Sequence, residues 1–147
     1  MSPEALREIA RNMVETVPQA SALGFKLRSI EPSRGSILTP WREDLVGDPD
    51  TGVIAGGVIT ALLDHACGLA IISTARDGTT PFSTATLDLR IDYMRAATPR
   101  ADIIAEAHCY KLTRTIAFVR AHAYDADPAD PIATAQAAFV LKRSPVA

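Results

Sequence analysis

Ala55-Gly56-Gly57-Val58-Ile59-Thr60-Ala61-Leu62-Leu63-Asp64 is the stretch that decides the fold, because it places two adjacent glycines at the start of an apolar helix. The first N–H groups of a helix lack backbone partners, and with the positive end of the helix dipole they favour an anion or oxyanion. Glycine at positions 56 and 57 removes the Cβ atoms that would keep a carbonyl group away, although each glycine costs roughly 1 kcal/mol of helix propensity. The stretch therefore predicts a helix whose first turn can hold a carbonyl oxygen.

Asp64 is the only charged residue between Asp50 and Arg76. A carboxylate among apolar side chains is unfavourable unless it is paired, protonated or used in chemistry. Two interpretations of the stretch follow. Either the glycines and Asp64 bind or attack a ligand, or the glycines serve helix packing and Asp64 has a structural partner.

The composition indicates one folded domain over residues 1–147, since 48% of the 147 residues are hydrophobic and 22% are charged. The formal net charge is -2 and no run of basic residues occurs, which argues against nucleic acid or an anionic membrane as partner. The apolar run 53–72 has the length of a membrane span, but Asp64 and His65 would lie in mid-bilayer, so we expect no membrane partner.

The two cysteines, Cys67 and Cys109, lack the spacing of a zinc site and are expected to be reduced thiols. The three histidines are scattered, so we expect no metal. The first residues alternate acids and bases without the apolar core of a secretory signal. These features together predict a cytoplasmic protein.

Hydrophobic spacing predicts a short helix within a lead-in over residues 1–20, which Pro18 is expected to end. Two strands over 24–30 and 36–41 precede a central helix over 55–75, and four strands follow it. These elements predict an α+β fold in which one antiparallel sheet of five to six strands wraps around one long central helix.

Alternation along the later strands predicts which side chains face the helix. In the strand after the helix, the predicted inner residues are Leu87, Leu89, Ile91 and Tyr93. Alanines alternate along the last two strands, which indicates that the helix lies close against the sheet. The open edges of such a sheet predict a homodimer in which sheets join edge to edge.

Two motifs carry a resemblance to a known family. Gly56-Gly57 is followed by an acid, Asp64, eight residues after Gly56, and residues 86–97 form a long strand that ends in Arg95-Ala96-Ala97. Over residues 46–141 the chain resembles the hotdog-fold acyl-CoA thioesterases, in particular the phenylacetate-pathway (PaaI-like) type. The two motifs in this order, with the expected elements between them, carry the resemblance.

The resemblance implies an enzyme that hydrolyses an acyl-CoA thioester to a carboxylic acid and coenzyme A. The N–H of Gly56 would polarise the carbonyl, and Asp64 of the partner subunit would act as general base or nucleophile at a dimer interface. Coenzyme A is part of the substrate, and no separate cofactor is implied.

The resemblance also implies substrate-binding positions around the helix. Gly57 adjoins the oxyanion donor. Asp48 and Asp50 flank Pro49, where the family carries an amide side chain, so either acid can substitute for it. Gly68 stands where related enzymes often carry a hydroxyl residue that assists the acid.

Further positions would contact the two ends of the substrate. The family places cations on the coenzyme A phosphates near Arg95, Lys111 and Arg114, with solvated surface charge as the alternative for each. Phe82 would line the acyl pocket, with core packing as its alternative.

Two departures from the family favour another function. Ala55 replaces the family's usual histidine, and Pro49 replaces its amide residue. A catalytically weak or silent acyl-CoA or acyl-ligand binding protein of the same fold is therefore the alternative. A hydratase is disfavoured, because it needs a histidine paired with an acid and only His65 lies nearby. The acyl group, the carrier (coenzyme A or acyl carrier protein) and the choice between dimer and tetramer stay open.

Overall fold

One antiparallel sheet of six strands forms the framework of the computed structural model, which describes residues 2–75 and 83–142. The strands follow the order β1-β2-β4-β5-β6-β3, so β1 and β3 are the sheet edges. Their bounds are β1 Lys26–Glu31, β2 Arg34–Thr39, β3 Ser83–Tyr93, β4 Ile103–Leu112, β5 Ile116–Tyr124 and β6 Ala133–Lys142. The predicted α+β architecture is confirmed.

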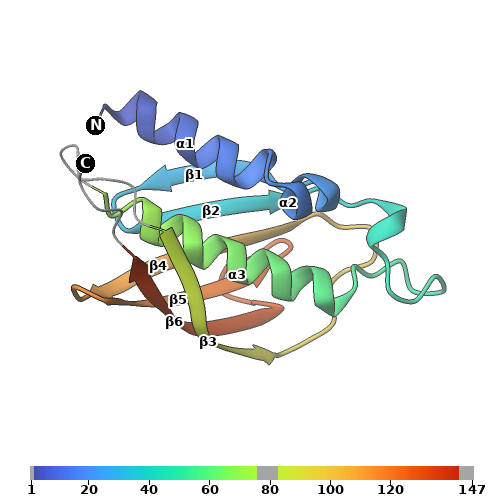
Figure 1. Ribbon diagram of the computed structural model, residues 1–147. Helices are drawn as coiled ribbons and strands as arrows, with labels where there is room; N and C mark the ends of the chain where they lie inside the picture. The colour runs from blue at the N-terminus through green and yellow to red at the C-terminus, as the bar shows by residue number, and fades with distance from the viewer. Residues whose placement is uncertain (1, 76–82, 143–147) are drawn as a thin grey trace.

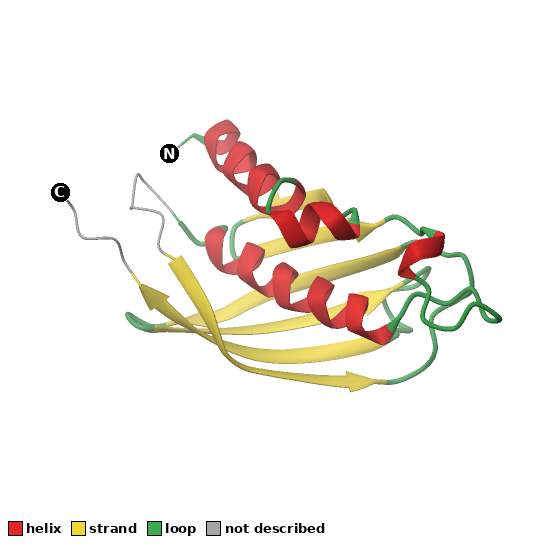
Figure 2. Cartoon of the chain, turned by 45° about the vertical axis from the view of Figure 1, so that its right-hand side comes forward, coloured by secondary structure: helices red, strands yellow, loops and turns green. Residues whose placement is uncertain are grey.

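The α-helices of the described residues all lie on one face of the sheet, with α3 (Gly56–Ile72) along its middle (Figures 1 and 2). A short 3-10 helix, η1 (Glu43–Leu45), precedes the loop that leads to α3. The helix α3 is shorter than the predicted 55–75. It ends because the hydroxyls of Ser73 and Thr74 donate hydrogen bonds to backbone carbonyls three residues earlier, at 2.6 and 2.7 Å.

The N-terminal region contains two helices where the sequence predicted one. Helix α1 (Pro3–Glu15) is capped by Ser2, and Pro18 begins α2 (Pro18–Leu23) instead of only ending the first helix. Proline suits the first helical position, since it has no N–H to leave unpaired there. Gly24, with φ 77°, ends α2, so the first strand starts at Lys26 and not at residue 24.

The inner sheet face carries small side chains, as predicted, and α3 packs against it. Each of its alanines is at most 6% exposed: Ala105, Ala107, Ala117, Ala121, Ala123, Ala133, Ala135 and Ala137. Gly35 in β2 lets the sheet approach even closer, since a Cβ there would lie 2.6 Å from Cγ of the fully buried Leu69. The many small side chains on this face therefore let α3 lie close to the sheet.

Strand β3 departs from the predicted alternation because it contains a β-bulge. Thr86 pairs with Phe139 and Asp88 pairs with Ala138, which leaves Leu87 unpaired and 58% exposed. The extra residue shifts the alternation, so Thr86 shares the inner face with Leu89 and Ile91. The prediction that Leu87 faces the helix is wrong for this reason, and Thr86 takes the inward position before the bulge.

We predict that Gly35→Ala lowers the free energy of unfolding by about 1–3 kcal/mol, because the added methyl group overlaps Leu69 and forces the helix from the sheet. Urea titration followed by circular dichroism measures this difference. Gly57→Ala is the matched control, since a Cβ there meets nothing within 4 Å. Equal stability of Gly35→Ala and wild type would show that α3 is not held at this distance.

Candidate functional site

The first turn of α3 is open to an incoming group. Gly56 and Gly57 are both exposed, and within residues 2–75 and 83–142 no backbone oxygen accepts from either N–H. The residue before the helix, Ala55, has an extended backbone and provides no side-chain cap. Two backbone donors at the positive end of a helix are therefore available to an oxyanion.

The fold does not require glycine at either position. A Cβ on Gly57 would meet nothing within 4 Å, and one on Gly56 would lie 3.8 Å from the Tyr93 ring, an ordinary contact distance. Helix packing therefore does not account for the glycine pair. The interpretation that remains is access of a ligand to the backbone.

Tyr93 joins the start of α3 to the end of β3. Its hydroxyl donates to the Gly56 carbonyl at 2.8 Å and lies 2.6 Å from the Thr60 hydroxyl, which also donates to that carbonyl, at 3.1 Å. These bonds orient the first helical turn and place an aromatic wall beside Gly56. Sequence reasoning placed Tyr93 on the inner sheet face but gave it no part in the site.

Asp64 lies two turns further along α3 and is half-buried. Thr86 donates its hydroxyl to Asp64 Oδ1 at 2.8 Å, which orients the carboxylate toward the edge strand β3. Gly68 does not hold this place: it is buried against α1, where a Cβ would lie 3.0 Å from Met13 Cε. Thr86 of β3 thus places a hydroxyl against Asp64, a contact that the bulge before Asp88 makes possible.

The two acids proposed to replace the family amide lie in the exposed loop before α3. Asp48 accepts the backbone N–H of Asp50 at 3.0 Å, and its carbonyl accepts the Thr51 hydroxyl at 2.9 Å. The loop returns to the helix through the bridge between Val46 and Ile54. The Asp48 side chain therefore shapes its own loop, and within the described residues it forms no hydrogen bond that would direct it toward Asp64.

Arg95 is bound within the protein rather than presented to a ligand. Its guanidinium pairs with both oxygens of Asp125 at 2.7 and 3.1 Å and with Asp130 at 3.3 Å. The Asp125 side chain is only 3% exposed, and its hydrogen bond to Arg95 lowers the pKa of that carboxyl well below its usual range. The structure thus gives Arg95 two acidic partners within the chain, and its binding of coenzyme A phosphates stays a prediction.

Lys111 and Arg114 are exposed at the hairpin between β4 and β5. Figure 1 places this hairpin at the end of the sheet near the last residues of α3, whereas Gly56 lies at the opposite end of the helix. Within one chain, the structure does not bring these cations to the glycines. Phe82 lies outside the described residues.

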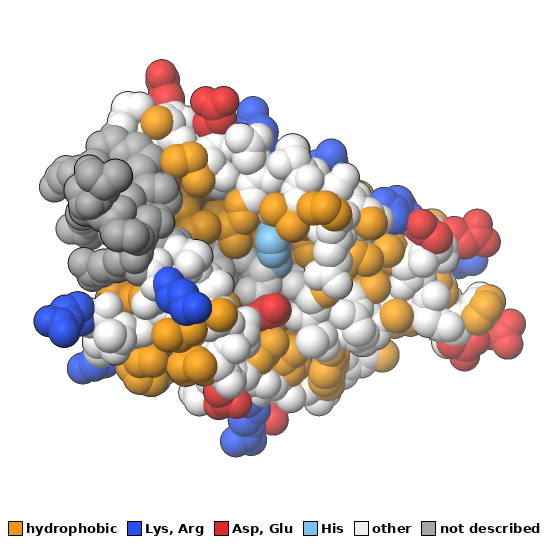
Figure 3. Space-filling model, in the orientation of Figure 1, with side chains coloured by type: hydrophobic (Ala, Val, Ile, Leu, Met, Phe, Trp, Pro, Cys, Tyr) orange, Lys and Arg blue, Asp and Glu red, His pale blue; other side chains and the backbone are white. Residues whose placement is uncertain are grey.

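The helix-bearing face has a hollow at its middle, flanked by hydrophobic side chains, and charged groups lie mainly at its periphery (Figure 3). Within the described residues, no three histidine, cysteine or carboxylate side chains gather as metal ligands. No helix there has the length and apolar character needed to cross a membrane. The chemistry that the site offers is that of a carboxylate, three hydroxyls and backbone N–H groups.

Comparison with known proteins gives consistent matches. Residues 51–132 match the family model described as the thioesterase superfamily. A protein of Halobacterium salinarum named as an esterase is 32% identical over 97 residues, 65% of this chain and 62% of that protein, so the match spans less than two thirds of that relative. Human acyl-coenzyme A thioesterase 13 is 25% identical over 115 residues, 78% of this chain and 79% of that protein.

Solved structures match over most of their length. A protein from Pseudomonas aeruginosa superposes with a TM-score of 0.81 at 35% identity, covering 92% of this chain and 98% of that chain. A variant of the phenylacetic acid degradation protein PaaI from Thermus thermophilus superposes with a TM-score of 0.70 at 25% identity, covering 84% and 98%. The resemblance to hotdog-fold thioesterases is confirmed, and the matches support thioester hydrolysis as the general activity.

We predict that Arg95→Gln destabilises the protein by about 3 kcal/mol at pH 7, because it leaves the buried Asp125 carboxylate without its cation. The lowered pKa of Asp125 means that the pair stabilises the fold above the ordinary carboxyl pKa of about 3.9, and that this stabilisation is lost as pH falls below it. The difference between variant and wild type should therefore shrink on acidification, as urea titrations at pH 7 and below pH 4 can measure.

Arg7→Gln, on an exposed position of α1, is the control for this experiment and should leave stability unchanged. A raised KM for acyl-CoA in Arg95→Gln without loss of stability would instead restore the substrate-binding role.

Proposed function

Since this chain belongs to the thioesterase superfamily, we propose that it hydrolyses acyl-CoA thioesters, releasing a carboxylic acid and coenzyme A. The observation that carries the proposal is the open glycine pair at the start of α3, together with the oriented carboxylate of Asp64 on the same helix. Packing within the chain does not require glycine at either position. The names of acyl-coenzyme A thioesterase 13 and of PaaI add support for this substrate class.

In the proposed reaction, the thioester oxygen accepts a hydrogen bond from Gly56 N–H at the positive end of α3. Negative charge grows on that oxygen as the tetrahedral intermediate forms, so a donor fixed there lowers the barrier. Removing one such donor typically costs about 2.7 to 4 kcal/mol of transition-state stabilisation. The bonds from Tyr93 and Thr60 to the Gly56 carbonyl keep the first turn in place during the step.

Asp64 would activate water as a general base, or attack the carbonyl itself and form an anhydride that water then cleaves. Both routes break the C–S bond and give a free acid and a thiol. Thr86 would hold the carboxylate so that Oδ2 stays available for the reaction, while Oδ1 accepts the hydroxyl hydrogen bond. Its role in this scheme is positioning.

The site would be completed by a second chain. Eight residues separate Gly56 from Asp64, which on a helix corresponds to about 12 Å, too far for one carbonyl group to contact both. The edge strand β3 and the residue after it expose Leu87, Tyr93 and Met94, each more than half exposed in the isolated chain. We therefore propose a homodimer joined along β3, in which Gly56 of one protomer faces Asp64 of the other.

The alternative is an acyl-ligand binding protein with the same pocket, favoured by Ala55. Ala55 offers only a methyl group, which forms no hydrogen bond at the start of α3. The preceding loop packs tightly against this methyl group, since a Cβ on Gly47 would lie 3.3 Å from it. The reducing cytoplasm is proposed as the compartment, because Cys67 and Cys109 are both free, buried thiols.

We predict that Asp64→Asn lowers thiol release from acyl-CoAs at least 100-fold, since the amide can neither take a proton nor attack. The measurement uses a panel of short, long and aryl acyl-CoAs, with calorimetric binding of the substrate as a second readout. Thr86→Val should lower kcat about tenfold with little change in KM, whereas Thr134→Val, on the other sheet face, should match wild type. Tight binding without turnover by wild type would favour the binding protein.

We predict that two inactive variants, Asp64→Asn and Gly57→Val, regain about a quarter of wild-type activity when they are unfolded together and refolded as a mixture. Half of the dimers are then mixed, and each mixed dimer has one intact site of two. Each variant refolded alone is the control. No recovery, or a stable monomer in sedimentation at micromolar concentration, would contradict a site shared between chains.

A further inference from the structure

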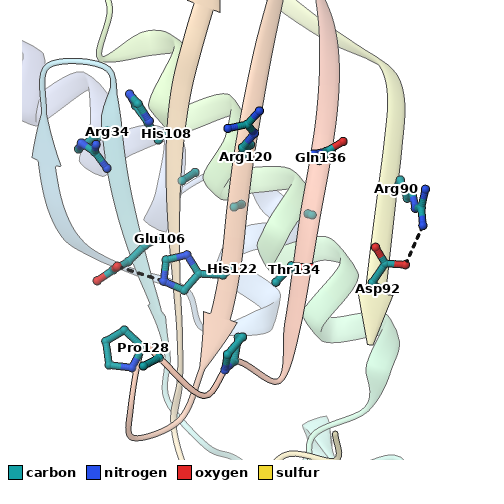
Figure 4. Close-up of a pocket in the computed structure, with 15 residues that line it drawn as sticks. Arg34, Arg90, Asp92, Glu106, His108, Arg120, His122, Pro128, Thr134 and Gln136 are labelled. Carbon is teal, nitrogen blue, oxygen red and sulfur yellow. Dashed lines mark hydrogen bonds and ion pairs between the residues drawn. The ribbon is translucent and has the colours of Figure 1, made fainter. Parts of the chain in front are cut away.

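The sheet face turned away from α3 carries a row of polar side chains, one from each of five neighbouring strands. Cross-strand pairing places each member directly opposite the next, and Figure 4 shows them side by side. In sheet order this cationic row consists of Arg34, His108, Arg120, Gln136 and Arg90. Four of its five members are basic, in a chain whose formal net charge is -2.

The described residues do not neutralise the centre of this row. Arg34 and Arg120 form no ion pair within residues 2–75 and 83–142. His108 lies between them, and its pKa is lowered by burial and by the two neighbouring arginines. Arg120 is held in place by the Tyr110 ring, 4.2 Å from its guanidinium carbon. Arg34 and Arg120 therefore stand two strands apart, on either side of His108, and both side chains are exposed.

Two acids beside the row, Glu106 and Asp92, are paired within the chain. Glu106 accepts from Arg28 at 3.2 Å and from Tyr124 at 2.7 Å, and it lies 3.4 Å from His122. Asp92 pairs with Arg90 at 3.3 Å, as Figure 4 shows. Glu31 lies opposite Arg34 in the register of β1 and β2, but within the described residues it forms no ion pair with it. Since the lowered pKa of His108 keeps its ring neutral at pH 7, the unpaired charges of the row are those of Arg34 and Arg120.

An open pocket of about 710 Å³ lies over the row. Its floor is the sheet, and the turn that carries Pro128 and Pro131 borders it beside His122 (Figure 4). A second hollow of about 270 Å³ over β1 and β2 shares Arg34 and Glu106 with it. These volumes suit a small molecule rather than an extended polymer.

We propose that the cationic row binds a phosphorylated small molecule with at least two linked phosphate groups. Guanidinium groups bind phosphate oxygens in bidentate pairs. The backbones of Arg34 and Arg120 lie two strands apart, about 10 Å, with His108 between them. That spacing lets each guanidinium bind a different phosphate of a linked pair. A second copy of this face is a poorer occupant, because its own excess of positive charge would meet that of the first.

This site is separate from the thioester site. Arg90 and Asp92 alternate along β3 with Leu89 and Ile91, which are partly buried against the core beside α3. The row and the pair of Asp64 and Thr86 therefore lie on opposite faces of the sheet. The inference is independent of the proposed hydrolysis.

The test compares inorganic triphosphate with orthophosphate at matched ionic strength, by calorimetry and thermal unfolding of the full chain. Triphosphate should bind saturably and raise the melting temperature, and orthophosphate should bind at least tenfold more weakly. The double variant Arg34→Gln with Arg120→Gln should bind triphosphate at least tenfold more weakly. It should be about as stable as wild type without ligand, because both side chains are exposed and form no ion pair within the described residues.

The matched control removes two exposed charges elsewhere, through Arg7→Gln with Lys26→Gln, and should bind triphosphate like wild type. Equal loss in the control, or no saturable binding to wild type, would overturn the proposal. So would a raised KM for acyl-CoA in the row variant, which would assign the row to the substrate. A change of oligomeric state in that variant would assign the face to a second copy and overturn it as well.

Discussion

The close packing of α3 against an alanine-lined sheet is the constraint on which the rest of the structure depends. Leu62, Leu63 and Leu69 are fully buried, and Gly35 permits a distance to Leu69 that a methyl group would prevent. Such packing opposes sliding or rotation of the helix, because a displaced leucine would leave a void or overlap the sheet. The positions of Gly56 at its start and of Asp64 within it are consequences of that packing.

A rigid helix also separates the two groups that the proposed chemistry needs together. Since they lie about two turns apart on one axis, neither can approach the other. The structure instead turns both toward the same edge strand: Tyr93 contacts the helix start, and Thr86 contacts the acid. A β-bulge between Thr86 and Asp88 makes the second contact possible while the first is kept.

The two faces of the sheet serve different physical purposes. The inner face is apolar and determines the helix position, whereas the outer face has no helix of the described residues over it and carries rows of charge. Glu106 and Asp92 there are paired inside the chain, whereas Arg34 and Arg120 form no ion pair within the described residues. Burial and packing explain the first face, and the proposed phosphate ligand would give the two arginines of the second face their partner.

By itself, the sequence determined the element types, the central helix, the alanine face, and Gly56 and Asp64 as candidates, because these depend on periodicity and local chemistry. Only the tertiary structure decided which residues are partners. Asp64 accepts from Thr86, 22 residues away, and Arg95 pairs with Asp125, 30 residues away. The strand register aligns Arg34 with His108 and Arg120. The tertiary structure also decided that Pro18 begins a helix and that Leu87 faces outward. Such outcomes depend on strand register and on a single bulge, which shift whole faces by one residue and leave no periodic signal in the chain.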